Sequence, residues 1–308
     1  MIADIVVIGS LNMDMVVRVD RRPEQGETLL GRDFFMSPGG KGANQAYAAG
    51  KLGASVAMIG QLGEDLFAGQ LLNNLSDARV ETRYMEKVQG QSSGVALITI
   101  DSEGDNSIIV APGANFSFTP ATIRKYEEVI RQAKILMLQL EIPLECVMEA
   151  ARIAKAHKVQ ILLDPAPAQP LPDELLCMVD YIVPNEAEIA QLTGIQVMDE
   201  PSAIEASLLL RNKGIGTVVS KLGDQGVVVT DASGSIFIPG MKVDAVDTTA
   251  AGDAFAGAFA TALVEGRSLK DAAYFANAVG ALTVTKPGAQ ASMPDRQLTE
   301  SFIKALPR

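Results

Sequence analysis

The sequence predicts an α/β fold: a doubly wound, mostly parallel sheet with helices on both faces, and a small additional β-sheet. Short apolar runs of strand length alternate along the chain with segments of helical periodicity, a pattern typical of parallel sheets covered by helices. Two segments, 14–36 and 93–113, break this alternation, because strand-forming residues fill them with no helix in between. We therefore predict one domain, residues 1–308, into which these two segments insert a small β layer.

The individual elements follow from these patterns in chain order. The apolar runs expected to form strands are residues 4–9, 55–60, 134–141, 159–164, 181–184 and 217–223. The helical patterns between them are residues 41–53, 64–77, 121–132, 143–158 and 202–214. A hairpin pattern at 226–240 precedes two further helices, expected at about 253–265 and 269–285.

The two inserted segments have the pattern of antiparallel hairpins. Apolar and polar residues partly alternate in both, and PEQGE and DSEGDN are typical turn sequences. The alternative is that they add two edge strands to the main sheet. We expect the separate layer, because no helical pattern accompanies either segment.

Composition excludes several classes of protein. The net charge is −11, from 26 Lys and Arg against 37 Asp and Glu, so the chain lacks the basic footprint of a nucleic-acid or lipid-surface protein. The N-terminal sequence MIADIVVIGSLNMD lacks the features of a signal peptide, and its apolar run is too short to cross a membrane. We therefore expect a cytoplasmic protein with no membrane partner.

The cysteines and the single histidine give no indication of a catalytic role. Only Cys146 and Cys177 are present, which argues against a disulfide framework and for two buried free thiols. The single histidine, His157, ends a helical pattern, so we expect it at a helix end or on the surface rather than in a catalytic triad.

Polar residues follow the predicted strands at the points where the strands end. These residues are Asn12, Asp14, Glu141, Asp164, Asn185, Glu186, Glu188, Gly223, Asp224 and Gly226. Ligands of open α/β sheets bind at the carboxyl ends of the strands, so the set predicts a site there. Asn12 and Asp14 project to one side of an extended segment and can hold neighbouring hydroxyls of a polyol.

The segment SPGGKGANQA places three glycines, Gly39, Gly40 and Gly42, at the start of a predicted helix. Glycine there permits positive φ and close approach of a ligand to the backbone. The spacing matches neither a P-loop nor a GxGxxG dinucleotide motif. Lys41 and Asn44 are expected near the helix start.

The segment DTTAAGDAFAGAFATAL sets an acid, Asp253, among small and apolar residues. Phe255, Phe259 and Leu263 share one helical face, which puts Asp253 in the first turn of the helix. One interpretation is an aspartate favoured by the helix dipole, which would also lower its pKa. The other is a base beside the free amides of a helix start, an arrangement suited to phosphoryl transfer.

The segments GGKGANQA and VDTTAAGDAFAGA resemble the two signature motifs of the ribokinase-like carbohydrate kinases. Shorter stretches, GSLNMD, QLE, DPAPA, PNEAE, KLGDQG and KPGAQASMP, are similar to the same family. The resemblance runs from about residue 4 to the C-terminus. It implies that segments 14–36 and 93–113 form a β-sheet lid, which the family often uses for homodimerisation.

The resemblance also implies an activity. The expected reaction is transfer of a phosphoryl group from ATP to the 5-hydroxyl of D-ribose, giving ribose 5-phosphate and ADP. Mg²⁺ and a monovalent cation such as K⁺ are the expected cofactors. The alternative is a kinase of the same family acting on another sugar, such as deoxyribose or a fructose-like sugar, or on a nucleoside.

The resemblance assigns roles to individual residues. The sugar-binding residues would be Asn12, Asp14, Gly40, Lys41, Asn44 and Glu141, with Asp253 as the catalytic base. The anion-binding backbone would be that of Ala250, Ala251 and Gly252. The nucleotide pocket would include Asn185, Lys221, Gly223, Asp224, Gly226, Gly252 and Asn277. Glu188, in the NxxE element with Asn185, would order Mg²⁺ through water. The monovalent-cation site would lie around Asp247, Thr249, Thr283, Lys286, Gly288 and Ser292.

Three positions depart from the family pattern. Lys221 stands where a small hydroxyl residue is usual, Ala256 where asparagine is frequent, and Asn277 where histidine is common. These departures affect the nucleotide side of the expected site. On the sugar side, Asn12 favours ribose over deoxyribose, because an amide there has a hydroxyl to bind. A non-catalytic sugar sensor is disfavoured, since the base, the anion-binding backbone and NxxE are all present.

Overall fold

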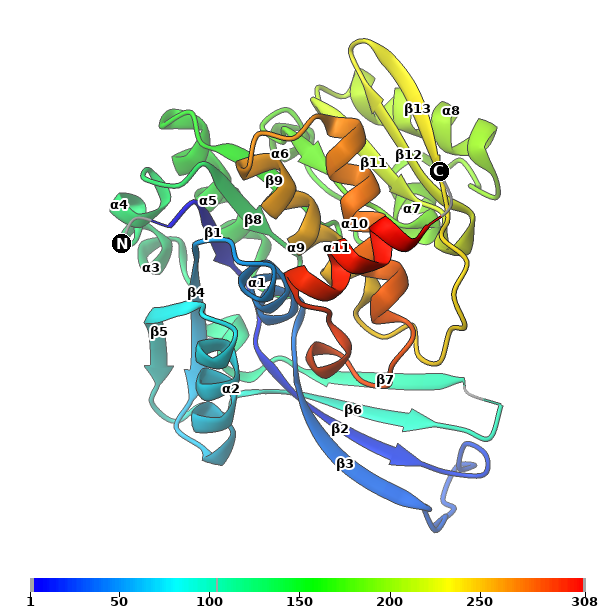
Figure 1. Cartoon of the computed structure of the whole chain (residues 1–308). Helices are drawn as coiled ribbons and strands as arrows, with labels where there is room; N and C mark the ends of the chain where they lie inside the picture. The colour runs from blue at the N-terminus through cyan, green and yellow to red at the C-terminus, as the bar shows by residue number, and fades with distance from the viewer. Residues whose placement is uncertain (1–2, 104, 307–308) are drawn as a thin grey trace.

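The computed structural model describes residues 3–103 and 105–306. The ends of the predicted domain 1–308 and Gly104 in the predicted turn DSEGDN lie outside this range. Within it, nine strands form one sheet in the order β13-β12-β11-β10-β9-β8-β1-β4-β5 (Figure 1). All neighbours are parallel except β11–β12 and β12–β13, which are antiparallel. The predicted doubly wound, mostly parallel sheet is confirmed.

The strands of the main sheet are mostly short. They are β1 (Ile5–Ile8), β4 (Val56–Gly63), β5 (Glu81–Val88), β8 (Ile135–Leu138), β9 (Gln160–Leu163), β10 (Tyr181–Ile182), β11 (Thr217–Lys221), β12 (Gly226–Asp231) and β13 (Gly234–Pro239). Every residue of β1, β4 and β8 is buried, as expected for strands covered on both faces.

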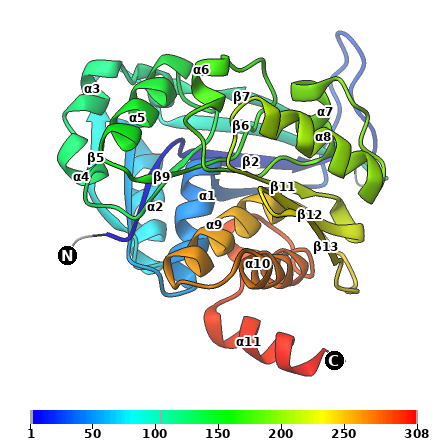
Figure 2. The same cartoon turned by 90° about the horizontal axis from the view of Figure 1, so that it is seen from above.

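Helices cover both faces of this sheet (Figure 2). One layer consists of α1 (Lys41–Lys51), α2 (Leu66–Asp77), α9 (Ala251–Val264), α10 (Leu269–Thr283) and α11 (Arg296–Ala305). The other consists of α3 (Pro120–Arg124), α4 (Glu127–Ile130), α5 (Leu144–Ala156), α6 (Asp173–Leu176), α7 (Glu186–Thr193) and α8 (Glu200–Asn212). Strand alternation divides the core accordingly: Ile5 and Val7 pack in the first layer, and Val6 and Ile8 in the second.

The inserted segments form a separate four-stranded sheet, the lid, in the order β3-β2-β6-β7 (Figure 1). Its strands are β2 (Asn12–Arg18), β3 (Asp33–Gly39), β6 (Gly94–Ile100) and β7 (Asn106–Ala111). The pairs β2–β3 and β6–β7 are antiparallel hairpins, and β2–β6 is parallel. The lid strands do not extend the main sheet, so the edge-strand alternative is wrong.

Two expectations from the sequence need correction. The helix expected at 121–132 is interrupted, because Tyr126 leaves helical geometry between α3 and α4 and donates its hydroxyl to Glu86 at 2.8 Å. Cys177 is exposed at the end of α6, whereas Cys146 is buried as expected. His157 caps α5 at the surface, as predicted, with Nε2 2.8 Å from Glu127.

Within the described residues, no helix has both the length and the apolar character that a membrane crossing requires.

Candidate active site

The glycine segment brings the start of α1 against the link between β1 and the lid. Gly40 has φ +87° and precedes α1, and a Cβ there would lie 2.7 Å from the backbone nitrogen of Asn12. A Cβ on Gly42 would lie 2.7 Å from backbone atoms of Gly9. Only glycine permits this approach without displacing the backbone. The start of α1 is thereby packed against the backbone of Asn12.

Hydrogen bonds fix two of the predicted sugar-binding residues. Glu141, after β8, accepts from the Ser10 hydroxyl at 2.5 Å and from the Lys41 backbone N–H at 3.0 Å. Asn12 is 3% exposed, and its Oδ1 accepts from Asn115 Nδ2 at 2.8 Å. This hydrogen bond fixes the orientation of the Asn12 side-chain amide within the protein itself.

Close packing of α1 on α9 brings the predicted base to the same place. Gly257 makes this possible, because a Cβ there would lie 2.6 Å from the Gln45 carbonyl. Asp253, in the first turn of α9, is 6% exposed. It accepts from Asn44 Nδ2 at 2.8 Å and from Gln45 Nε2 at 3.2 Å. The acid is therefore buried, but both carboxylate oxygens have a donor.

The electrostatics of Asp253 differ from the prediction. Burial raises the pKa of this carboxyl, and the nearby positive charge of Lys41 only partly opposes that effect. The expected lowering by the helix dipole is wrong, because desolvation outweighs it. A raised pKa makes Asp253 a stronger proton acceptor than an exposed aspartate.

The charges around Asp253 include a second perturbed acid and a lysine. Burial raises the pKa of Asp14 to about 7, and the charges of Glu141 and Asp253 add to the effect. Burial by itself lowers the pKa of Lys41, but the surrounding carboxylates, Asp253 first among them, raise it overall. Lys41 therefore stays protonated at the centre of this acidic group.

The backbone predicted to bind an anion leads into α9 through a left-handed residue. Ala250 precedes the helix with φ +58°, a left-handed conformation. The amide N–H of Ala251 donates to the Thr248 carbonyl at 3.3 Å, and that of Ala254 donates to Ala250 at 2.8 Å. The amides of Gly252 and Asp253 belong to the first turn, where helical geometry supplies no intrahelical acceptor.

The NxxE element begins α7. Asn185 Oδ1 accepts from the Glu188 N–H at 2.8 Å, and Glu188 Oε2 accepts from the Asn185 N–H at 2.8 Å, a reciprocal cap. Glu188 is 7% exposed. Burial raises the pKa of its carboxyl, while the charge of Lys221 opposes this.

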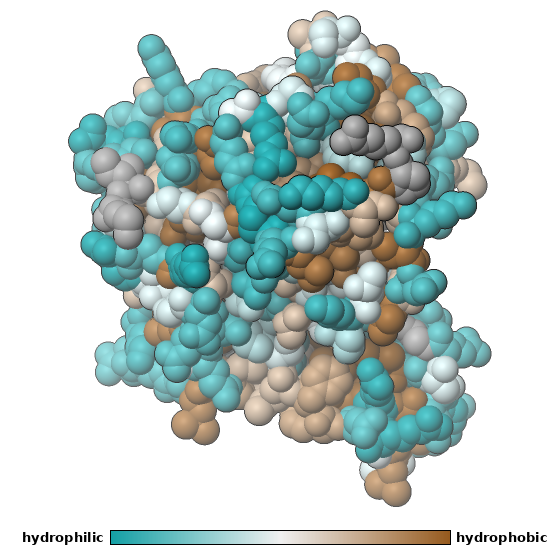
Figure 3. Space-filling view, viewed as in Figure 1, coloured by the Kyte–Doolittle hydropathy of each residue, from teal (hydrophilic) through white to brown (hydrophobic). Residues whose placement is uncertain are grey.

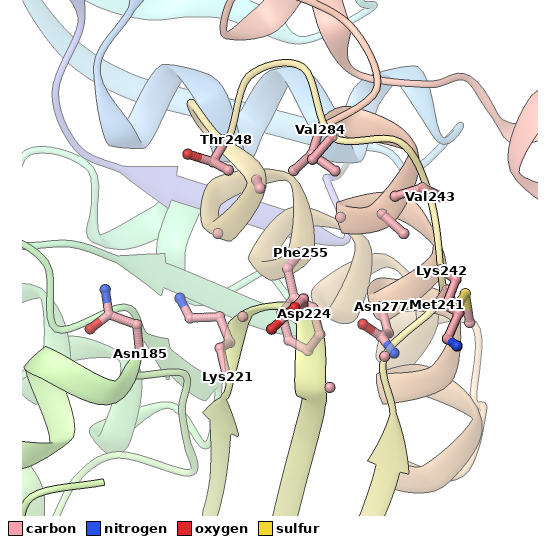
Figure 4. A pocket seen from close by; sticks show the side chains of 18 of the residues that line it. Asn185, Lys221, Asp224, Met241, Lys242, Val243, Thr248, Phe255, Asn277 and Val284 are labelled. Carbon is pink, nitrogen blue, oxygen red and sulfur yellow. The ribbon is translucent and has the colours of Figure 1, made fainter. Parts of the chain in front are cut away.

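A cavity of about 630 Å³ adjoins the N-terminus of α9 (Figure 4). The ends of β11 and β12, the segment 240–248, α9 and α10 enclose it. Every residue predicted for the nucleotide pocket lines it: Asn185, Lys221, Gly223, Asp224, Gly226, Gly252 and Asn277. Phe255, Met241 and Val243 supply apolar walls. The volume is in the range of small-molecule and cofactor sites.

The residues predicted around a monovalent cation lie in two neighbouring loops. Asp247 Oδ1 accepts from the Thr249 N–H at 2.9 Å, and Oδ2 accepts from the Gly288 N–H at 2.8 Å. The Asp247 N–H also donates to Val284 at 3.2 Å. The other predicted positions, Thr283, Lys286 and Ser292, belong to the second loop or border it. Among the described residues there is no cluster of three or more His, Cys, Asp or Glu side chains suited to a metal.

Comparison with known proteins identifies the family. The profile of the pfkB family carbohydrate kinases matches residues 2–296. The chain belongs to this family. It is 44% identical to the ribokinase of Haemophilus influenzae over 298 residues, 97% of each chain. It is 38% identical to the deoxyribokinase of Salmonella typhi over 301 residues, 97% of this chain and 98% of that protein.

A solved structure shows the same pfkB family fold. Arabidopsis thaliana ribokinase, in complex with ribose and ATP, superposes with a TM-score of 0.94 at 35% identity, covering 99% of this chain and 100% of that one. The family recognised from the two signature motifs is confirmed, and so is the prediction of a carbohydrate kinase.

Sequence reasoning did not assign several residues that complete the site of this pfkB family kinase. Gln45 bonds to Asp253 and also donates to Asp164 at 2.8 Å. Gln290 donates to Asn44 Oδ1 at 2.9 Å and so orients the amide that holds Asp253. Asn115 holds Asn12. Only Asp164 gave a signal in the sequence, as an acid at the end of a strand; the others lie far along the chain from their partners.

Proposed function

We propose that the protein transfers the γ-phosphoryl group of ATP to the 5-hydroxyl of D-ribose, giving ribose 5-phosphate and ADP. The observation that carries the proposal is the position of Asp253. It is a buried carboxylate at a helix start, with the predicted sugar-binding residues on one side and the 630 Å³ cavity on the other. The Arabidopsis complex with ribose and ATP supports both substrates.

In the proposed reaction, Asp253 takes the proton of the 5-hydroxyl as that oxygen attacks the γ-phosphorus. Its raised pKa suits this role, and its hydrogen bonds to Asn44 and Gln45 hold it in place. The amides at the start of α9 face the developing charge on the phosphoryl oxygens. The sugar would be held by Asn12, Asp14, Gly40, Lys41, Asn44 and Glu141.

The proposal includes two metal ions. Both Glu188 oxygens already accept hydrogen bonds from Asn185, so this carboxylate fits Mg²⁺ bound through water better than direct coordination. Bound Mg²⁺ would neutralise negative charge on the phosphate groups of ATP. The loops of Asp247 and Gly288 would hold a monovalent cation such as K⁺, mainly through backbone carbonyls, since both Asp247 oxygens accept backbone N–H bonds.

The proposal also includes the state of the protein in the cell. Exposed apolar side chains on the lid, among them Phe34, Leu97 and Ile109, support a homodimer through the lid. Figure 3 shows apolar surface on the lower part of the molecule, where Figure 1 places the lid. A cytoplasmic location belongs to the same proposal, because the reaction consumes ATP.

The test is release of ADP with D-ribose, 2-deoxyribose, fructose and adenosine as acceptors, each with Mg²⁺ and either K⁺ or Na⁺. We expect the highest kcat/KM with ribose, and a further increase with K⁺. Preference for another acceptor would overturn the ribose assignment and leave the kinase chemistry intact. Absence of ADP release with any acceptor would contradict the proposed chemistry itself.

A further inference from the structure

Lys221 stands at the border between the nucleotide cavity and the catalytic base. It is the last residue of β11 and lines the cavity, where Figure 4 shows its side chain extending toward Asn185. Its ammonium nitrogen lies 3.2 Å from the position that a Cβ on Gly252 would occupy. The charge is therefore directly over the first turn of α9, one residue from Asp253.

This position is electrostatically unusual for a lysine. The N-terminus of a helix carries a partial positive charge, so an ammonium group beside it is unfavourable unless an anion is present. Within the described residues, two carboxylates face the charge of Lys221. The Oδ1 of Asp164 is 3.5 Å away, longer than a normal charged hydrogen bond, and the Glu188 carboxyl feels its charge without a direct ion pair. The ammonium group, which has three donors, is only loosely engaged.

Asp164 is itself incompletely satisfied. It is 2% exposed, and its Oδ2 accepts from Gln45 at 2.8 Å. Its Oδ1 has no hydrogen bond within the described part of the chain. Asp164 therefore compensates the charge of Lys221, but no hydrogen bond between them fixes the position of the Lys221 ammonium group.

We propose that Lys221 is a catalytic residue that binds the phosphoryl group in transfer, with Asp164 as the residue that positions it. The proposal rests on the proposed function. The bond from the sugar 5-oxygen to phosphorus forms while the bond from phosphorus to the β-phosphate oxygen breaks. The proton goes to Asp253, and ADP leaves with the electron pair of the broken bond. Lys221 keeps its proton and stabilises the charge on the transferred oxygens.

The other lysines near the cavity are less suited to this role. Lys41 lies on the sugar side, where its charge is shared among four carboxylates. Lys242 lines the same cavity but lies away from Lys221 (Figure 4). Lys242 is therefore a matched control, with the same charge in the same cavity but distant from the start of α9.

The test compares the binding of ADP with that of the non-hydrolysable ATP analogue AMP-PNP, both with Mg²⁺, by calorimetry. Lys221→Met should weaken AMP-PNP binding about tenfold and ADP binding less than about twofold, and lower kcat about 100-fold, because the proposed contact of Lys221 is with the third phosphate. Lys221→Arg should retain most of the AMP-PNP affinity. Lys242→Met should affect both nucleotides equally.

A double variant separates catalysis from stability. Lys221→Met alone removes the nearer positive charge from Asp164, a buried carboxylate, and should lower the melting temperature. Adding Asp164→Asn should restore the melting temperature while AMP-PNP affinity and kcat stay low. Recovery of affinity and kcat in the double variant would reduce Lys221 to a structural counter-ion and overturn the proposal.

The wild-type protein distinguishes failure of this inference from failure of the proposed function. Suppose that the wild type phosphorylates a sugar. If Lys221→Met then weakens ADP and AMP-PNP binding equally, or weakens neither, only the role of Lys221 is wrong. If the wild type binds neither nucleotide, the proposed function fails and the role of Lys221 fails with it.

Discussion

Asp253 is buried with two amide donors and a neighbouring lysine, so its charge is compensated without a direct ion pair in the sugar site. Replacing it by asparagine removes the proton acceptor and keeps the shape. One of the two hydrogen bonds from Asn44 and Gln45 is lost, a cost that removal of the buried charge offsets. We expect Asp253→Asn to lower kcat about 1,000-fold, within the usual range for loss of a general base. Ribose and ADP affinities, measured by calorimetry, should change little.

The control for this prediction is stability. Because burial raises the pKa of Asp253, its ionised form is costly in the folded state, and the neutral asparagine should not lower the melting temperature. Unchanged turnover in the variant would exclude Asp253 as the base.

Asp14 gives a prediction about pH. Its pKa is raised from 3.8 to about 7 by burial and by Glu141 and Asp253, so the folded protein binds a proton that the unfolded chain has lost above pH 4. The stability from this proton is fully present below the unfolded pKa and is lost as pH rises through about 7. Asp14→Asn should therefore unfold at a temperature less dependent on pH between pH 5 and 8.

The measurement is thermal unfolding of both proteins across that range. Asp253 and Glu188, whose pKa values are also raised, are present in both proteins, so the difference between them reports Asp14 and its charge coupling to Asp253. Parallel curves for the two proteins would show that Asp14 ionises normally in the fold.

The sequence predicted which residues belong to the site better than it predicted which residues hydrogen-bond to them. Asp14, Glu141 and Asp253 were predicted from their places at strand ends and at a helix start. Gln45 and Gln290 were not assigned, because their hydrogen-bond partners Asp253 and Asn44 lie far along the chain from them. Gln290 lies 246 positions from Asn44, which it orients. Such contacts depend on how α1, α9 and the loop before α11 pack, and no local pattern encodes that packing.

Among the elements, the turn into α1 has a strict sequence requirement. Gly40 and Gly53 have nearly the same backbone angle, φ +87° and +90°, but differ in surroundings. A Cβ on Gly40 meets backbone atoms of Asn12 and Leu11 at 2.7 and 2.8 Å, whereas a Cβ on Gly53 meets nothing within 4 Å. Substitution at Gly53 therefore measures the cost of the backbone conformation alone, and substitution at Gly40 adds the cost of a steric clash.

We expect Gly53→Ala to destabilise the protein by about 1–2 kcal/mol, the cost of a left-handed alanine. Gly40→Ala should cost about 3 kcal/mol or more and also weaken ribose binding, because the start of α1 must move away from Asn12. Urea unfolding and calorimetry with ribose measure the two effects. If both variants lose the same free energy of unfolding, the start of α1 can move without further cost, and the predicted clash at Gly40 is wrong.

Prediction succeeded for the buried strands of the main sheet and failed for two elements that are largely exposed. The all-apolar strands β1 and β8 were evident from the sequence. The edge strand β5, ETRYMEKV, was not predicted, because it carries four charged residues and only partial burial. The same holds for α11, where Thr299 is the buried residue. The break between α3 and α4 depends on the tertiary contact of Tyr126 with Glu86.

For the whole molecule, the lid predicts association. Met36, Leu97 and Ile109 lie in one cross-strand row with Met15, and all three are exposed. This row is on the face of the lid opposite Asp14, since adjacent residues of a strand point to opposite sides. Ile109→Glu should convert the proposed dimer into a monomer, as measured by sedimentation velocity.

An exposed leucine elsewhere provides the control. Leu298, in α11, is 42% exposed and lies outside the lid, so Leu298→Glu should leave the sedimentation coefficient unchanged. A wild-type protein that sediments as a monomer at all concentrations would contradict the dimer.

The lid also has a consequence for motion. Asn12 and Asp14 belong to β2, while Asn44, Glu141 and Asp253 belong to the body of the molecule, so a sugar in the proposed site would join the two parts. Most residues of β3 and β7 are exposed, and such segments open more readily than a buried core. Amide hydrogens of the lid should therefore exchange with solvent well before those of β1 and β8. Bound ribose should slow that exchange, because part of its binding free energy goes into holding β2 against the body.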